Sequence, residues 1–359
     1  MLGHKLTIWF PAILITVVIL GVIVYLTTFR SLDQRKAVRE AIQEQLIAEE
    51  SALEPFTSPL YVSLVMHAEE DLQGGVSPKV LVPDYDGDEA LMLHFTTVLR
   101  EFAQMCAGHG VKINFGSDWT FSDGVANFDP MFYTDLEAMG HEIDAHAHES
   151  YVMYHEVRGK IVTAGGNPTA VASGATEGNI YDRMSYFDSY WPEFQYIWGV
   201  ALAGHGSGED LSGWVWRPDT DDWLVHDSEG RYIYIGHGEQ MNSVELIEEA
   251  VAGRYENRIN TYALFTNPRE FLALKGTEGI PDEWTAKPED ADYWENRIEW
   301  WDEFLSDLEL VDEIEFASLT EIAEIFEANE SNLDFEFTAD DHPRSELPMT
   351  VRRKNAGYP

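Results

Sequence analysis

The feature that most restricts the fold of this chain is the regular alternation of strand and helix patterns after residue 60. Short apolar runs predict strands at residues 60–69, 111–119, 141–149, 212–220, 230–239, 259–268 and 313–318. Helical spacing of apolar residues predicts helices at residues 90–110, 129–140, 293–311 and 319–329. Strands that alternate with helices usually pair in parallel. We therefore predict an α/β fold whose parallel sheet is either open or closed into a barrel.

Two of these helices carry recognisable end signals. The helix at 90–110 is expected to stop at Gly108 and Gly110, because glycine accepts the backbone conformation that ends a helix. The helix at 129–140 is expected to begin with Asp129 as its N-cap and Pro130 in its first turn.

Composition limits the partners and the chemistry. The 359-residue chain is 45% hydrophobic and 13% aromatic, which is enough for a sizeable core. It has 23 Lys and Arg residues against 64 Asp and Glu residues, and the net charge of −41 repels nucleic-acid phosphates. Cys106 is the only cysteine, which excludes an intrachain disulfide and a cysteine-rich zinc site. We therefore expect no nucleic-acid partner, and any metal has to be held by His, Asp or Glu.

An uncharged apolar segment of 19 residues near the start of the chain, Thr7 to Tyr25, predicts a transmembrane helix. At about 1.5 Å per residue it can cross a hydrocarbon core of about 30 Å. Trp9 and Tyr25 lie at its ends, where aromatic rings prefer the membrane interface. A cleaved signal peptide is the alternative, but no small-x-small cleavage site follows. We expect residues 1–29 to anchor a single-pass protein in the lipid bilayer.

The rest of the chain divides into three parts. Residues 30–55 have alternating charges and few large apolar residues, which is typical of a solvated helical stalk. Residues 56–330 contain the alternating strands and helices and are expected to form one barrel domain. Residues 331–359 are acidic, then basic, and are expected to pack little.

Chemically active residues gather at the ends of predicted strands. His67 and Glu69 end the first strand, and His146 and His148 end the strand at 141–149. Residues two apart on a strand point to the same face, and active residues of parallel α/β folds lie at the carboxyl ends of the strands. Imidazoles combined with a carboxylate form a hydrolytic zinc arrangement. We predict a divalent metal site here, with Zn²⁺ as the expected metal; polar residues that merely cap a barrel are the alternative.

Several motifs together resemble the NodB-like polysaccharide deacetylase domain, carbohydrate esterase family 4. The most specific is GHEIDAHAHES at residues 140–150, and MHAEED at 66–71 occupies the place of the family's first acidic motif. Weaker similarities are found in WRPDT at 216–220, LFTNPREF at 264–271 and EFASLTEIAEIF at 315–326. The resemblance implies a distorted (β/α)7-type barrel that removes acetyl groups from a polysaccharide or other glycan with the help of a divalent metal.

The resemblance also assigns roles to individual residues. Glu69 and His146 match metal ligands, and Arg217 matches the arginine that orients the catalytic acid or base. The family's second ligand histidine falls at Ser150, so His148 takes that role as our own inference. The family's catalytic-base aspartate falls at His67, which is expected either to act as the base or to bind metal.

The catalytic acid has no secure match in the chain. His237, after the strand at 230–239, is the candidate for that role, and Asn267 lies at a related strand end. The departures from the family pattern leave two further readings open. One is an inactive relative that binds glycan without cleaving it, and the other is a structural protein of the cell envelope.

Two arguments predict opposite orientations of the domain relative to the membrane. Lys5 precedes the apolar segment, whereas Arg30, Arg35, Lys36 and Arg39 follow it, and the positive-inside rule places such a domain in the cytoplasm. The family resemblance implies chemistry on the opposite side of the membrane. We expect the domain to be extracytoplasmic.

Overall fold

The computed structural model of the chain describes residues 56–68, 71–72, 81–82, 85–147, 153–175, 194–199, 213–219, 225–236, 238, 242–271 and 297–335. The predicted anchor at 1–29 and stalk at 30–55 lie outside these residues. Among the residues that are described, no helix has both the length and the apolar character needed to cross a bilayer.

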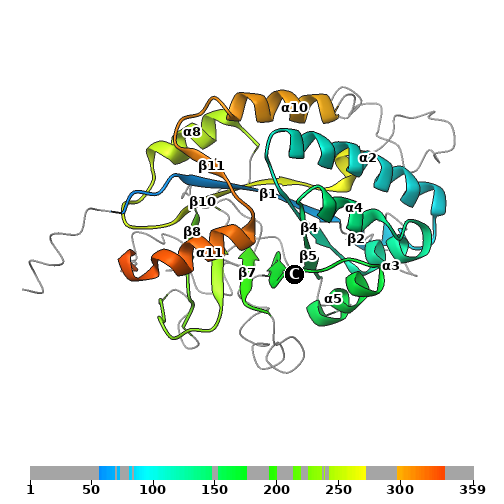
Figure 1. The fold of residues 1–359 in the computed structure, drawn as a ribbon, viewed down its shortest axis with the longest axis horizontal. Helices are drawn as coiled ribbons and strands as arrows, with labels where there is room; N and C mark the ends of the chain where they lie inside the picture. Colours follow the sequence, from blue (N-terminus) through cyan, green and yellow to red (C-terminus); the bar gives the residue numbers. More distant parts are fainter. Residues whose placement is uncertain are drawn as a thin grey trace, which may run out of the picture. The chain divides into compact units, whose positions relative to one another are not determined.

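The main sheet closes on itself to form a barrel (Figure 1). Its strands run in the order β1-β4-β5-β6-β7-β9-β8-β10, and β10 pairs again with β1. The strands of the barrel are β1 (Leu60–Ala68), β4 (Ile113–Ser117), β5 (Glu142–His146), β6 (Val171–Ser173), β7 (Tyr196–Gly199), β8 (Gly213–Trp216), β9 (Ile233–Gly236) and β10 (Asn260–Thr266). The prediction of an α/β fold is confirmed, and its closed alternative is the one observed. The ring differs from the (β/α)7 form that the family resemblance implied, because it is closed by eight strands of the described residues.

Among the described residues, three short strands lie outside this ring. β11 (Ile314–Phe316) pairs with the first residues of β1, directly before the part of β1 that pairs with β4. β2 (Asp71–Leu72) and β3 (Leu81–Val82) form a separate antiparallel pair.

One strand departs from the parallel pattern. β8 is antiparallel to both of its neighbours, with Trp216 opposite Tyr234 of β9 and Trp214 opposite Asn260 of β10. An antiparallel neighbour needs no crossover helix, and just after β8 an isolated antiparallel bridge joins Pro218 to His226. The residues that follow β8 therefore lie at the opposite end of the barrel from those that follow the parallel strands.

Helices surround the barrel, and most of them cover its outside (Figure 1). They are α2 (Glu89–Gly108), α3 (Trp119–Phe128), α4 (Phe132–Ala138), α5 (Tyr154–Thr163), α8 (Val244–Ala252), α10 (Arg297–Leu308) and α11 (Leu319–Asn329), with 3-10 turns η1 (Pro268–Phe271) and η4 (Glu330–Asn332). α2 ends at Gly108, as predicted, and Gly110 follows with a φ of 71°. The predicted N-cap of α4 is wrong, because Met131 occupies that position. Asp129 instead follows α3 and accepts two hydrogen bonds from the Arg100 guanidinium.

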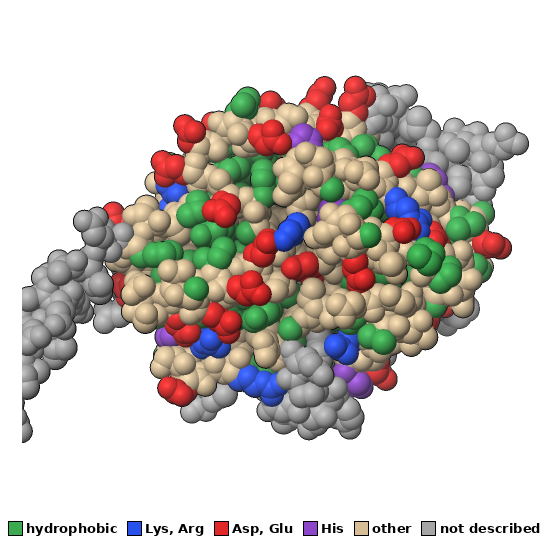
Figure 2. Space-filling model, in the orientation of Figure 1, with side chains coloured by type: hydrophobic (Ala, Val, Ile, Leu, Met, Phe, Trp, Pro, Cys, Tyr) green, Lys and Arg blue, Asp and Glu red, His purple; other side chains and the backbone are tan. Residues whose placement is uncertain are grey.

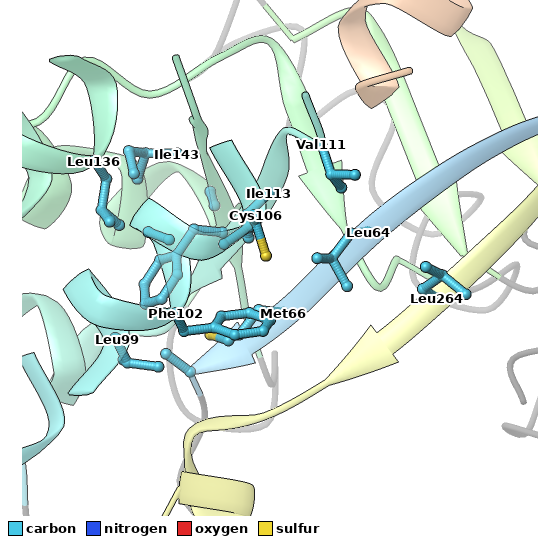
Figure 3. Close-up of a cluster of buried hydrophobic side chains, with 14 of the residues drawn as sticks. Leu64, Met66, Leu99, Phe102, Cys106, Val111, Ile113, Leu136, Ile143 and Leu264 are labelled. Atoms are coloured by element: carbon cyan, nitrogen blue, oxygen red, sulfur yellow. The ribbon is translucent and has the colours of Figure 1, made fainter. Parts of the chain in front are cut away.

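The two faces of β1 show how the barrel is packed. Leu64 and Met66 face outward and join the core beneath α2, where Phe102 packs (Figure 3). The alternate residues belong to the inner face, where Val65 joins a second apolar cluster. By the same alternation, His67 lies on the inner face.

α11 packs against this inner cluster. Leu319, Ile322 and Phe326 of α11 are fully buried there. The helix starts with a capping box in which the Ser318 hydroxyl accepts from the backbone N–H of Glu321, whose carboxylate accepts from the N–H of Ser318. The apolar side chains of one helix therefore help to fill the barrel interior.

Buried polar side chains connect the start of α11 to the strands. The side-chain carbonyl of Asn114 accepts from the N–H of Leu319 at 3.0 Å, and its amide donates to Glu142 at 2.8 Å and to Asp144 at 3.0 Å. Ser318 donates to Glu142 at 2.7 Å. Satisfied polar groups of this kind make a buried network tolerable.

The first residues of the predicted C-terminal tail do pack. Leu333 and Phe335 lie against the inner cluster, and the ring of Phe335 stacks on His226 at 3.6 Å between centroids. Residues 336–359, the remainder of that segment, lie outside the described residues.

Carboxylates are spread over the visible face of the domain, with basic side chains between them (Figure 2). Several of the basic side chains form salt bridges with carboxylates. Arg100 contacts Asp129 and Asp135, and Lys160 contacts Asp123. The excess of negative charge favours solubility but adds self-repulsion to the compact state.

We predict that Asp144 makes stability fall as pH rises. Burial, followed by the nearby charge of Glu142, raises the pKa of Asp144 to about 8, whereas an unfolded aspartate titrates near ~3.9. The folded state therefore holds the proton more tightly, and its contribution is lost between about pH 4 and pH 8. Urea unfolding of Asp144→Asn should show a smaller loss of stability than the natural chain between pH 5 and pH 8. An unchanged pH dependence would contradict this assignment.

Candidate functional site

Two histidines predicted at different strand ends meet inside the barrel. His67 is the penultimate residue of β1, and His146 is the last residue of β5. Their rings stack with centroids 3.8 Å apart and planes inclined by 23°. Both side chains are buried, at 2% and 4% exposure. The structure thus brings together the two motifs, far apart in sequence, that were predicted to share a site.

The contact is possible because the strand between them carries a glycine. β4 separates β1 from β5, so their backbones are roughly 10 Å apart. A Cβ on Gly116 of β4 would lie 2.7 Å from the ring of His67 and 3.3 Å from the Cβ of His146. The missing side chain leaves the space across which the two rings meet.

A second glycine, Gly174, lies against the other side of the stacked ring pair. Gly174 follows β6 with a φ of 80°, a conformation that favours glycine. A Cβ there would approach Nδ1 of His146 and Cε1 of His67, each at 2.8 Å. Both the conformation and the space therefore require glycine at this position.

Ser173 is hydrogen-bonded to both histidines. Its hydroxyl lies 2.9 Å from Nε2 of His67, and its backbone carbonyl accepts from Nδ1 of His146 at 2.8 Å. The hydroxyl of Tyr154 also donates to this carbonyl, at 3.1 Å. Because a carbonyl can only accept, Nδ1 of His146 carries a proton, and in the neutral ring the lone pair is on Nε2.

Aromatic rings surround His67 on its other sides. Trp198 of β7 and Phe265 of β10 meet it edge-on, at 5.5 Å and 5.1 Å between centroids. His67 therefore lies in a largely apolar pocket of rings, which holds the imidazole in one orientation.

Of the two stacked histidines, His146 has the geometry of a metal ligand and His67 does not. A ligand histidine commonly donates its other ring N–H to a carbonyl, as His146 does to Ser173. His67 does not suit the same metal, because nearly parallel stacked rings hold their in-plane lone pairs side by side. Two ligands of one zinc ion would need lone pairs that converge at about 2.0–2.1 Å.

Three predicted site residues lie outside the described residues: Glu69, His148 and His237. Among the residues that are described, no group of three or more His, Cys, Asp or Glu is arranged to hold a metal ion. The predicted ligand set of Glu69, His146 and His148 therefore stays a prediction. Asn267 is described and lies between β10 and η1, where its carbonyl accepts from the N–H of Glu270.

Arg217 does not join the histidines. It follows the antiparallel strand β8, so it lies towards the opposite end of the barrel. Its guanidinium donates to Glu330 at 2.9 Å and to the carbonyl of Gly230 at 3.1 Å, and it lies over the ring of Phe326. The expectation that Arg217 orients a catalytic group at the histidines is corrected: it ties the β8–β9 connection to the end of α11.

Sequence reasoning missed Ser173, Gly116 and Gly174. Gly116 was visible within the predicted strand at 111–119, at a position where glycine usually weakens pairing and marks a close approach. Ser173 ends β6, a three-residue strand with too few residues for a clear pattern, and Gly174 follows it directly. Only the folded arrangement shows that these residues contact the histidines.

Comparisons with known proteins give likenesses of structure. No family model and no curated protein matches the sequence. A candidate polysaccharide deacetylase from Mycobacterium smegmatis is similar over 78% of this chain and 97% of its own, with 14% identity and a TM-score of 0.44. A protein from Pseudomonas aeruginosa PAO1, also a candidate polysaccharide deacetylase, is similar over 75% and 91%, with 14% identity and a TM-score of 0.43.

An enzyme named for a different reaction is structurally similar to this chain to the same degree. The 4-alpha-glucanotransferase from Thermococcus litoralis is similar over 74% of this chain but 40% of its own, with 11% identity and a TM-score of 0.45. These likenesses do not assign an activity.

We predict that Gly174→Ala destabilises the protein more than Gly110→Ala. Both glycines have positive φ, 80° and 71°, so each alanine incurs about 1–2 kcal/mol of backbone strain. A Cβ at Gly110 meets nothing within 4 Å, whereas one at Gly174 meets both histidine rings and adds about 1–3 kcal/mol. Denaturant unfolding of the two variants measures the difference. Equal losses would show that the rings move aside freely.

Proposed function

We propose that this chain is a divergent relative of the NodB-like polysaccharide deacetylases and a metal-dependent hydrolase that removes acetyl groups from a glycan. The observation that carries the proposal is the stacking of His67 on His146 at the carboxyl end of the barrel. These residues lie in the two motifs, at 66–71 and 140–150, that most resemble the family's metal and catalytic motifs. The carboxyl ends of barrel strands are also where α/β barrels carry their chemistry.

Glu69, His146 and His148 would hold the metal, which we propose to be Zn²⁺. When bound, such an ion supplies a nucleophile near neutral pH and polarises the acetyl carbonyl. The chain's own part at His146 is to present Nε2, because the Ser173 carbonyl holds the proton on Nδ1. Second contacts of this kind fix both the tautomer and the ring direction.

His67 is proposed as the general base. An imidazole can accept a proton near neutral pH, and His67 stands where the family has an acidic base. Its ring is held by Ser173 on one nitrogen and by Trp198 and Phe265 at its edges. This fixed orientation would spare the reaction the cost of ordering the base.

His237 remains the proposed general acid, which would protonate the leaving amine or alcohol. It comes directly after β9, and β9 runs parallel to β7. The carboxyl end of β9 therefore lies at the same end of the barrel as the carboxyl ends of β1 and β5, where the two histidines meet.

We also propose that residues 1–29 anchor the barrel to a membrane and that the barrel is extracytoplasmic. The uncharged segment from Thr7 to Tyr25 supports the anchor. A glycan substrate in the cell envelope would favour the outer side, against the charge distribution around that segment.

A glycan-binding protein without activity is the second candidate. It is favoured by His67 standing in place of the usual aspartate and by Ser150 standing in place of the second ligand histidine. Burial of both stacked rings, at 2% and 4% exposure, also favours it, because a reacting carbonyl has to reach the base.

We predict that His146→Ala abolishes zinc binding and lowers acetate release at least about 100-fold, because it removes a ligand of the catalytic metal. Zinc content is measured on purified protein, and acetate release is measured on acetylated chitin and xylan oligomers. His109→Ala is the matched control, since His109 caps the C-terminal end of α2 and contacts Asp302 and Glu309. It should keep both zinc and activity.

The outcomes separate the two candidates. One tightly bound zinc per chain with acetate release that His146→Ala removes supports the hydrolase. Glycan binding that persists in the presence of a chelator, with no acetate released by the natural chain, supports the binding protein and contradicts the hydrolase.

A further inference from the structure

Ser173 contacts both histidines through two different groups. The hydroxyl lies 2.9 Å from Nε2 of His67, and the backbone carbonyl lies 2.8 Å from Nδ1 of His146. The residue is fully buried at the end of β6. One residue thus meets a nitrogen on each of two rings that come from other strands.

We propose that Ser173 is a positioning residue that sets the orientation of both histidines, its hydroxyl acting on His67 and its carbonyl on His146. The inference rests on the proposed function for its catalytic meaning. The structural part of the proposal states which ring nitrogen of each histidine is hydrogen-bonded to Ser173, and this can be tested in a protein without activity.

The peptide of Ser173 is held firmly enough for this role. In the sheet, Ser173 is paired with His146 on one side and with Trp198 on the other. The next residue, Gly174, donates its N–H to the carbonyl of Trp198 at 2.8 Å. Moving the Ser173 carbonyl would break this pairing, so the carbonyl is a fixed acceptor for His146.

The two contacts have different consequences. The carbonyl fixes the proton of His146 on Nδ1 and turns Nε2 away from β6. The hydroxyl holds His67 across the space left by Gly116, in the stacked position 3.8 Å from His146. A change that removes the hydroxyl alone should therefore disturb His67 and leave the tautomer of His146 intact.

Because Ser173 is fully buried, it is suited to position other side chains and not to act as a nucleophile. Its hydroxyl is enclosed between the histidine rings and the sheet, and its exposed fraction is 0%. A serine nucleophile has to be reachable by the substrate carbonyl, whereas a positioning residue acts through the side chain it holds.

The test is nuclear magnetic resonance of the ring nitrogens in the full-length, metal-free protein labelled with ¹⁵N-histidine. Long-range proton–nitrogen spectra distinguish the two tautomers, and His67→Gln and His146→Gln assign the signals. We expect the natural chain to show His146 protonated on Nδ1. In Ser173→Ala the Nε2 signal of His67 should move, while both signals of His146 keep their positions.

Two further variants keep the test decisive. Ser173→Cys fills the same space with a much weaker hydrogen-bonding group and should move the His67 signal in the same direction if Ser173→Ala does not fold. Tyr154→Phe removes the other donor to the Ser173 carbonyl and should leave the His67 signals unchanged. A His67 signal that stays in place in the folded Ser173 variants overturns the proposal, as does a His146 ring protonated on Nε2.

Kinetics adds a separate readout. If the chain releases acetate, Ser173→Ala should lower kcat about 10- to 100-fold, because a catalytic group misplaced by about 1 Å can cost about 100-fold in rate, with KM and zinc content unchanged. An unchanged kcat overturns the role of Ser173 in catalysis. A natural chain without activity refutes the proposed function, and the resonance result then decides the positioning of the rings by itself.

Discussion

The site depends on a simple spatial constraint: side chains from two strands separated by a third can meet only if the middle strand leaves room. Gly116 on β4 leaves that room, because a Cβ there would overlap the ring of His67. Gly174 leaves the matching room beyond β6. The barrel supplies the curvature that turns both histidines inward, and the two glycines convert inward-facing side chains into a stacked pair.

The parts of the fold that depend on local pattern were predictable from the sequence. β1, β5 and α2 were expected because their apolar spacing and end signals are strong. α3 was not, because its sequence contains Gly124, which has low helix propensity and is needed where a Cβ would lie 2.4 Å from the carbonyl of Tyr85. The direction of β8 was also hidden, since the pattern of a strand does not record which way its neighbours run.

The site shows the same division between local and spatial information. His67 and His146 could be predicted because strand ends in parallel folds carry chemistry, and the motifs around them resemble a known family. Arg217 was misplaced because its motif was interpreted without knowing that β8 is antiparallel. Ser173 could not be singled out, because its importance arises from contacts with two rings that the sequence places 27 and 106 residues away.

The most direct test of the central claim is the position of zinc in crystals of the metal-loaded protein, located by anomalous scattering. The account predicts a peak at about 2.0–2.1 Å from Nε2 of His146, with the ring of His67 alongside but not coordinated. A peak bound to His67, a peak at Nδ1 of His146, or no peak at the carboxyl end of the barrel would contradict it.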